Sequence, residues 1–273
     1  MFGVSNGLLG FLNFLTLFLS MPIIGIAWTL QLEGQTECEK LLRIPMSTLG
    51  IFLLVVSIMG LIGSCCQSAR LLKIYLGLML LLLLGIFCFM ILTVVVTTNK
   101  DAGVQVMGKG YREYRLEESH GLLKRLVMDD KYWPTFKSCI IDSQVCLIVA
   151  DHALLDAIEF DLLEDWPPVE SGCCKPPTYC GFEYRNSTFW AVPKSGLASK
   201  DHDCLTWRNR GDTLCYNCNS CKAGFLANLN DALRDRISFN ICFLIFLIFI
   251  LTIGWQALRN SLAGKNTKQK CYA

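Results

Sequence analysis

The sequence predicts an all-α membrane protein, in which a four-transmembrane-helix bundle carries a disulfide-rich, mainly helical large extracellular loop. Four long stretches of the 273-residue chain contain no charged residue. Each exceeds the roughly 20 apolar residues that a helix needs to span about 30 Å of hydrocarbon, where an open strand would leave its backbone unpaired. A segment with nine of the 15 cysteines separates the third stretch from the fourth. The uncharged stretches are residues 1–32, 44–69, 74–99 and 237–258.

The distribution of charge predicts the orientation of the chain. All 23 acidic residues lie in the connections after the first and the third stretch, and the opposite side holds only basic residues. Because an excess of Lys and Arg marks the cytoplasmic face, both termini are expected in the cytosol. Acidic residues outnumber basic ones in the outer segments, which argues against a nucleic-acid partner. The basic residues of the cytosolic side are Arg70, Lys73, Arg259, Lys265, Lys268 and Lys270.

These observations divide the chain into segments. The first stretch lacks a basic start and is too long for the apolar core of a signal peptide, so we expect it to remain as a span. The predicted segments are 1–99 for the first three transmembrane helices, with a small extracellular loop at 33–43 and a cytosolic loop at 65–73, then 100–236 for the large extracellular domain, 237–258 for the fourth helix and 259–273 for a cytosolic tail.

Ten cysteines are expected outside the cytosol, where oxidising conditions permit disulfides. The large loop alone holds nine, an odd number, and Cys38 of the small loop makes the number even. We therefore expect five disulfides, one of which ties the small loop to the large one. Ten cysteines allow on the order of 10³ pairings, so their count does not give the connectivity. The ten are Cys38, Cys139, Cys146, Cys173, Cys174, Cys180, Cys204, Cys215, Cys218 and Cys221.

Cys215, Cys218 and Cys221 follow one another at equal spacing and admit three interpretations. In a cytosolic chain, thiolates at this spacing suggest zinc or an iron–sulfur cluster. They also suit a membrane thiol oxidoreductase, which needs a redox-active cysteine pair. Since the orientation places them outside among seven other cysteines, we favour structural disulfides and predict no metal and no cofactor.

Cys65 and Cys66 lie at the cytosolic end of the second stretch, next to basic residues. Juxtamembrane cytosolic cysteines are common substrates for S-palmitoylation, so we predict acylation at both positions, with unmodified interfacial thiols as the alternative. Cys271 in the tail is a further candidate. Cys88 and Cys242 lie in or just inside spans, where we expect them to pack against neighbouring helices.

The run from Glu170 to Pro177, Glu-Ser-Gly-Cys-Cys-Lys-Pro-Pro, is the most specific motif in the chain. Adjacent cysteines do not bond to each other without strain, so each is expected to reach a different distant partner. Gly172 is interpreted as a source of backbone freedom before the pair. The motif, the four spans, the unequal outer loops, the run that ends at Gly224 and the short basic tail resemble the tetraspanin family. The Gly-Cys-Cys-Lys-Pro-Pro form resembles its plant branch.

The resemblance covers the whole chain and implies a non-enzymatic scaffold that associates laterally with itself and with other membrane proteins. It implies microdomain formation and roles in cell–cell contact, vesicles and development, at the plasma membrane and on endosomes and extracellular vesicles. Membrane lipid is a further implied partner. The resemblance also implies that Cys173 and Cys174 bond to later cysteines of the loop, such as Cys221 and Cys204. Animal members place the glycine after the cysteine pair, and this departure argues against transferring the animal disulfide pairings to this chain.

Apolar periodicity predicts helices near the membrane ends of the large loop. One helix is predicted over 147–162, and another over 225–233 that runs on into the fourth span. The third span is predicted to continue upward through Tyr111 and Tyr114. Residues 175–214 contain many Pro and Gly and are predicted to be rich in turns.

Asn186 opens an N-glycosylation sequon, Asn-Ser-Thr, on the predicted outer side, and we expect a glycan there. Aromatic residues cluster around the sequon. They form either local core around the disulfides or an exposed patch of the kind enriched at protein–protein hot spots. The candidate partner-binding residues are Phe182, Phe189, Trp190 and Trp207.

Small residues and amides are expected to hold the spans together. No acid or base lies within a span, which disfavours an ion-coupled transporter. Asn13, Asn240 and Gln256 should find hydrogen-bond partners between helices, with a lipid headgroup as the alternative partner. The glycines expected at close helix contacts are Gly3, Gly7, Gly60, Gly63, Gly77 and Gly85.

The chain shows no recognisable catalytic arrangement. Its three histidines, His120, His152 and His202, are far apart, and neither a phosphate-binding glycine loop nor a nucleophile elbow occurs. We therefore predict a membrane scaffold without enzyme activity. The rival hypothesis is the membrane thiol oxidoreductase that would use the Cys215, Cys218 and Cys221 cluster.

Overall fold

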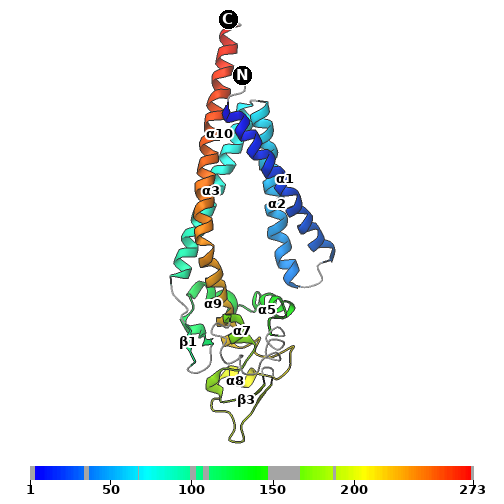
Figure 1. Ribbon diagram of the computed structural model, residues 1–273, viewed down its shortest axis with the longest axis vertical. Coiled ribbons are helices and arrows are strands. Elements are labelled where there is room, and N and C mark those ends of the chain that lie inside the picture. The colour runs from blue at the N-terminus through cyan, green and yellow to red at the C-terminus, as the bar shows by residue number, and fades with distance from the viewer. Residues whose placement is uncertain are drawn as a thin grey trace. The chain divides into compact units, whose positions relative to one another are not determined.

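The computed structural model describes residues 4–33, 37–66, 68–98, 103–106, 111–146, 167–186 and 189–271 (Figure 1). Internal contacts divide the chain into two compact units. We call residues 1–92 together with 237–273 the span unit, and residues 93–236 the loop unit.

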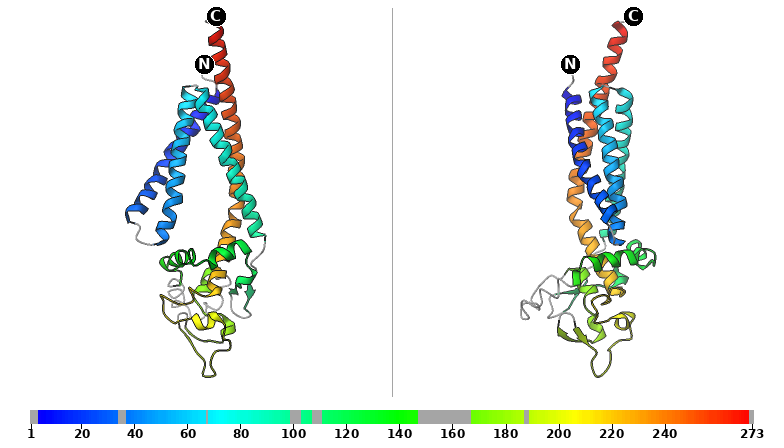
Figure 2. Two further views of the ribbon diagram at one scale, coloured as in Figure 1. Left: turned by 180° about the vertical axis from the view of Figure 1, so that it is seen from behind. Right: turned by 90° about the vertical axis from the view of Figure 1, so that its right-hand side faces the viewer.

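Four long helices build the span unit, and each contains a segment long and apolar enough to cross a membrane. The four-span fold is thus confirmed. α1 and α2 lie side by side as an antiparallel pair, and α1 also contacts α10 (Figures 1 and 2). α3 and α10 run antiparallel and meet where a Cβ at Gly254 would lie 2.8 Å from the Leu76 side chain. The helices are α1 (Val4–Glu33), α2 (Glu37–Cys65), α3 (Ala69–Thr97) and α10 (Ile237–Cys271).

The second helix is longer than predicted. α2 begins at Glu37, inside the predicted small loop 33–43, and α3 begins at Ala69, inside the predicted cytosolic loop 65–73. The residues that precede the second uncharged stretch include Glu, Lys, Leu and Arg, which are strong helix formers. The helix therefore extends beyond the apolar stretch itself.

The buried side chains of the span unit gather near the α2–α3 turn. There the α1–α2 pair meets the α3–α10 pair, and the two pairs diverge toward their other ends (Figure 2). The Asn13 amide is buried in this cluster, where it donates to the Leu9 carbonyl at 2.9 Å and to the Tyr75 hydroxyl at 3.3 Å. The amide thus joins two helices, as the sequence predicted.

Two of the predicted close glycine contacts occur. A Cβ at Gly60 would overlap the Asn13 side chain, and one at Gly63 would lie 2.5 Å from the Leu72 side chain. The prediction is wrong for three others, because a Cβ there would meet open space within the described part of the chain. These three are Gly7, Gly77 and Gly85, and Gly3 lies outside the described residues.

The loop unit combines short helices with two small antiparallel sheets, in which β1 pairs with β2 and β3 with β4. Its turn-rich part, 175–214, agrees with the sequence prediction. Its elements are β1 (Val104–Gln105), β2 (Arg112–Glu113), the 3₁₀ turn η1 (Leu116–Glu118), α4 (Gly121–Met128), α5 (Trp133–Asp142), α7 (Pro168–Cys173), the 3₁₀ turn η2 (Thr178–Cys180), β3 (Glu183–Asn186), β4 (Phe189–Ala191), α8 (His202–Thr206) and α9 (Asn219–Asp235).

The predicted helical continuation of the third span is wrong. α3 ends at Thr97, and Tyr111 and Tyr114 flank strand β2 instead. Gly103 has φ +53°, a left-handed conformation that an α-helix does not contain. The helix expected over 225–233 is present as α9, and the helix expected over 147–162 lies outside the described residues.

Candidate functional site

Helices α7 and α9 touch backbone to backbone at the centre of the loop unit. A Cβ at Gly172 would overlap the Ser220 carbonyl oxygen, and one at Gly224 would overlap the Pro168 carbonyl oxygen. Gly172 lies inside α7 and has no positive φ. Its interpretation as a source of backbone freedom is therefore wrong: the position needs a residue without a side chain because another helix occupies the space.

The adjacent cysteines at the end of α7 bond to different partners, as their proximity requires. Cys173 bonds to Cys221 on α9, as the resemblance implies. Cys174 bonds to Cys146, which precedes it in the chain, and not to Cys204. The expected pairing of Cys174 is thus wrong, and Cys204 pairs instead with Cys180.

The remaining cysteines that the sequence places outside the cytosol are also oxidised. Cys38 and Cys139 each take part in a disulfide. Cys215 bonds to Cys218, and both are fully buried. Because Cys221 is bonded to Cys173, the cluster that suggested zinc or redox chemistry is divided between two buried disulfides.

A buried ion pair joins the Cys-Cys-Lys motif to strand β2. The Nζ of Lys175 lies 2.9 Å from the Oε1 of Glu113 and 3.9 Å from the centre of the Tyr111 ring, and the lysine side chain is 3% exposed. Thr178 donates to the same carboxylate from its backbone N–H and its hydroxyl, each at 2.8 Å. Burial alone raises the pKa of Glu113, but the Lys175 charge and these hydrogen bonds outweigh it and hold the pKa below its ordinary value.

Asp203 caps helix α9 from another element. Its carboxylate accepts hydrogen bonds from the backbone N–H of Asn219 at 2.7 Å and of Ser220 at 2.8 Å. These are orphan donors of the first helical turn, which favour a negative partner. Asp203 is buried, so the cap forms part of the interior.

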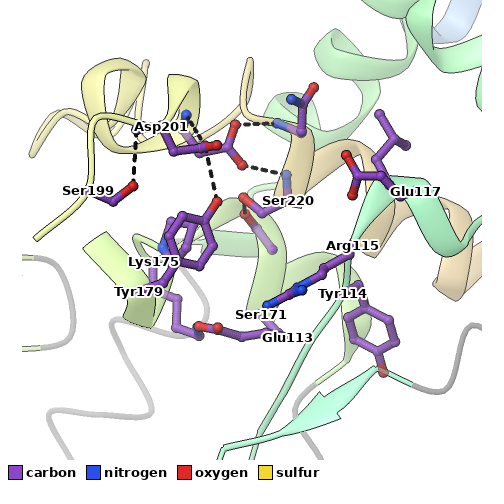
Figure 3. Close-up of a pocket in the computed structure, with 15 residues that line it drawn as sticks. Glu113, Tyr114, Arg115, Glu117, Ser171, Lys175, Tyr179, Ser199, Asp201 and Ser220 are labelled. Carbon is purple, nitrogen blue, oxygen red and sulfur yellow. Dashed lines mark hydrogen bonds and ion pairs between the residues drawn. The ribbon is translucent and has the colours of Figure 1, made fainter. Parts of the chain in front are cut away.

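The ion pair and the α9 cap form opposite parts of a pocket of about 300 Å³ (Figure 3). Between them stands Tyr179, whose hydroxyl donates to the Oδ1 of Asp201 at 3.2 Å. Burial raises the pKa of Tyr179, and the nearby Asp203 and Asp201 carboxylates raise it further, so the phenol stays protonated. The residues that line the pocket are Glu113, Tyr114, Arg115, Leu116, Glu117, Ser171, Gly172, Lys175, Pro177, Tyr179, Ser199, Asp201, Asp203, Asn219 and Ser220.

The sequence does not predict this pocket. Lys175 and Gly172 belong to the Glu-Ser-Gly-Cys-Cys-Lys-Pro-Pro motif, but no sequence pattern connects Arg115, Tyr179 and Asp201. They meet only because β2, α7 and α9 pack together.

The aromatic cluster divides into two groups. Trp190 and Trp207 are buried in the core, and the half-buried Phe182 packs against Trp207 with ring centres 6.5 Å apart. The local-core alternative therefore holds for these three, and an exposed binding role is wrong for both tryptophans. Phe189 and Tyr184, on the β3–β4 hairpin, are about half exposed.

The remaining predicted positions are spread over both units. Asn186 ends strand β3, and the other two residues of its sequon lie outside the described residues. Cys65, Cys66, Cys88 and Cys242 are free thiols on exposed positions of the span unit. Exposure at Cys88 and Cys242 contradicts the packing role expected for them between the helices of one chain.

Comparison with known proteins agrees with the architecture. The profile of the Tetraspanin family matches residues 5–260. Tetraspanin-8 of Arabidopsis thaliana is 43% identical over 94% of this chain and 93% of its own length, and Tetraspanin-7 of the same plant is 41% identical over 94% and 97%. Tetraspanin-11 is 37% identical over 98% and 99%. No solved structure matches. Four apolar helices, a disulfide-rich loop and this similarity along the whole length show that the chain belongs to the tetraspanin family and to its plant branch.

Proposed function

We propose that this tetraspanin is a non-enzymatic scaffold of the plasma membrane and endosomes, which gathers itself and other membrane proteins into microdomains for cell–cell contact, vesicle and developmental roles. The supporting observation is the exposure of its spans. In three of the four spans only 17% of the most apolar 18-residue segment is buried, and in the other 33%. Apolar faces of this breadth are available to neighbouring helices and to membrane lipid.

The loop unit supplies a second contact surface in this proposal. With both termini in the cytosol, residues 100–236 face outward as the charge asymmetry predicts. Tyr184 and Phe189 offer half-exposed rings on a hairpin that is tied to the cross-linked core through Trp190, because the Tyr184 and Trp190 rings lie 5.1 Å apart. A rigid aromatic surface of this kind binds a partner at low entropic cost. A glycan at Asn186 would limit which face of the hairpin is accessible.

Acylation would add affinity for ordered membrane. Cys65 and Cys66 are exposed beside the α2–α3 turn, where the sequence places the cytosolic surface. We therefore propose both as palmitoylation sites. Each buried methylene of an attached chain contributes about 0.8 kcal/mol of membrane affinity.

In-membrane cross-linking followed by purification in mild detergent and mass spectrometry tests the scaffold. We expect multimers and a reproducible set of membrane proteins, reduced several-fold by Phe189→Ala and unchanged by Leu205→Ala, an exposed apolar control on α8. Recovery of monomers alone would refute lateral association. Equal recovery from both variants would refute the hairpin surface while leaving the spans as the contact.

The Cys65→Ser/Cys66→Ser double variant tests acylation, with Cys242→Ser as the matched exposed-thiol control. Hydroxylamine-sensitive labelling of the protein should disappear in the double variant and persist in the control. Labelling that persists in the double variant would show that acylation takes place elsewhere.

A further inference from the structure

The walls of the loop-unit pocket are held by contacts within the protein. The Glu113 carboxylate is occupied by Lys175 and Thr178, and both Asp203 oxygens are occupied by backbone N–H groups of α9. The Ser171 hydroxyl donates to the Arg112 carbonyl. These groups shape the pocket, but their hydrogen-bonding positions are already filled, so they have little capacity left to bind a ligand.

Three charged groups of the lining keep such capacity. The Arg115 guanidinium and the Glu117 carboxylate are exposed and make no hydrogen bond or ion pair within the described residues. Asp201 receives Tyr179 and the Asp203 N–H on its Oδ1 only, which leaves its Oδ2 as an acceptor toward the pocket. The hydroxyl of Ser199 accepts from the Asp201 N–H at 3.2 Å and retains its proton for donation.

The signs of these charges limit which charged groups a ligand of the pocket can carry. A cationic ligand would meet the guanidinium of Arg115, and a compact inorganic anion would meet Glu117 and Asp201. A ligand with one carboxylate and several hydroxyls satisfies both sides: the carboxylate pairs with the planar guanidinium, and the hydroxyls donate to the carboxylates.

The placement of these groups suggests the shape of the ligand. Arg115 enters the pocket from the segment after β2, whereas Ser199 and Asp201 stand on the loop before α8, across the pocket from it (Figure 3). The ring of Tyr179 lies between the two sides (Figure 3). In an α-amino acid the ammonium and the carboxylate stand on the same carbon, so the carboxylate cannot face Arg115 without bringing the ammonium toward it. A six-membered uronic acid ring carries its carboxylate on one edge and hydroxyls on the opposite edge, and it offers a face to the tyrosine. The volume of about 300 Å³ lies at the small end of ligand pockets.

We infer that this pocket binds a uronic acid, either free or as a residue of an acidic oligosaccharide. Arg115 holds the carboxylate, Asp201 and Ser199 hold hydroxyls across the ring, and Tyr179 supplies the flat surface. This site is independent of the contacts proposed for lateral association, because none of its residues lies on a span or on the β3–β4 hairpin.

Saturation-transfer NMR on the full-length protein in nanodiscs tests the inference, with D-galacturonic acid and its trimer as probes and D-galactose and its trimer as uncharged counterparts. We expect galacturonate to bind at least tenfold more tightly than galactose, about 1.4 kcal/mol. Arg115→Gln should remove this preference, whereas Arg125→Gln, an exposed arginine on α4, should not change it.

Two tyrosine variants separate the ring from the hydroxyl. Tyr179→Phe keeps the flat surface and should keep affinity within about threefold, and Tyr179→Ala should weaken both sugars alike by tenfold or more. Equal affinity for galactose and galacturonate, unchanged binding by Arg115→Gln, tighter binding of inorganic sulfate, or no saturation transfer to either sugar would overturn the assignment.

Discussion

The ammonium of Lys175 lies 2.9 Å from the carboxylate of Glu113, although 62 positions of sequence separate the two residues. Lys175 is the lysine of the Cys-Cys-Lys-Pro-Pro motif, and its position over the Tyr111 ring fixes strand β2 beside α7. One wall of the pocket therefore depends on this pair.

Glu113→Gln should destabilise the loop unit by roughly 3–5 kcal/mol, because it leaves a lysine that is 3% exposed without its counter-charge. The midpoint of thermal unfolding of the full-length protein in detergent, followed by tryptophan fluorescence, measures this loss. Glu118→Gln is the control, since Glu118 is exposed on the same segment. A midpoint that falls equally in both variants would show that the pair contributes nothing specific.

The same pair predicts a dependence of stability on pH. The folded-state pKa of Glu113 lies below its ordinary value of 4.5, so its contribution is complete above pH 4.5 and is lost as pH falls through the lower folded pKa. The unfolding midpoint should therefore decline as the pH falls below 4.5, with a shallower decline in Glu113→Gln. Parallel declines in wild type and variant would assign the acid sensitivity to other carboxylates.

Gly172→Ala should destabilise the loop unit by about 1–3 kcal/mol or more, because its methyl group would overlap the Ser220 carbonyl of α9. Gly211→Ala is a matched control, since a Cβ at Gly211 meets open space in the described structure. Unfolding midpoints and the amount of protein that reaches the cell surface measure the effect. If Gly172→Ala behaves like Gly211→Ala, the backbone contact between α7 and α9 is not a source of stability.

The sequence predicts those features of this protein that depend only on residues close together in the chain. Uninterrupted apolar stretches gave α1, α3 and α10, since lipid leaves the backbone no other arrangement. The contact of Gly172 with α9 was not predictable, because it depends on how two distant segments cross.

The disulfide connectivity and the pocket were beyond the sequence for the same reason. Cys174 bonds to Cys146, and not to the partner side of Cys173, because adjacent residues at the end of α7 point in different directions. The number of cysteines in the sequence does not predict this pairing. Arg115 and Tyr179 come together only after β2 and α7 have packed. The local apolar pattern determines the spanning helices, whereas packing between distant segments determines the pocket of the loop unit.

The disulfides should contribute to stability in the order of the loops that they close. By the chain-entropy relation, Cys215–Cys218, with a separation of 3, contributes roughly 2 kcal/mol, whereas Cys173–Cys221, with a separation of 48, contributes about 4 kcal/mol. Paired Cys→Ser replacement of each bridge avoids stray thiols. The thiol-oxidoreductase hypothesis predicts instead that loss of Cys215–Cys218 abolishes turnover of a dithiol substrate. Unfolding midpoints and a thiol-exchange assay on both variants decide between a structural and a catalytic role for this disulfide.

Asn13 and Gly60 form a matched pair inside the span unit. Gly60→Ala places a methyl group against the Asn13 amide, which is buried and already bonded to the Tyr75 hydroxyl. The single variant should lower the temperature at which the detergent-solubilised protein loses its monodisperse gel-filtration peak. Asn13→Ala should also lower it, through the loss of an interhelical hydrogen bond of about 0.6–2 kcal/mol.

The double variant should be more stable than the sum of the two losses predicts, because the smaller side chain at position 13 frees the space for the new methyl group. Simple additivity would mean that the two residues do not touch, and that a different contact sets the spacing of α1 and α2.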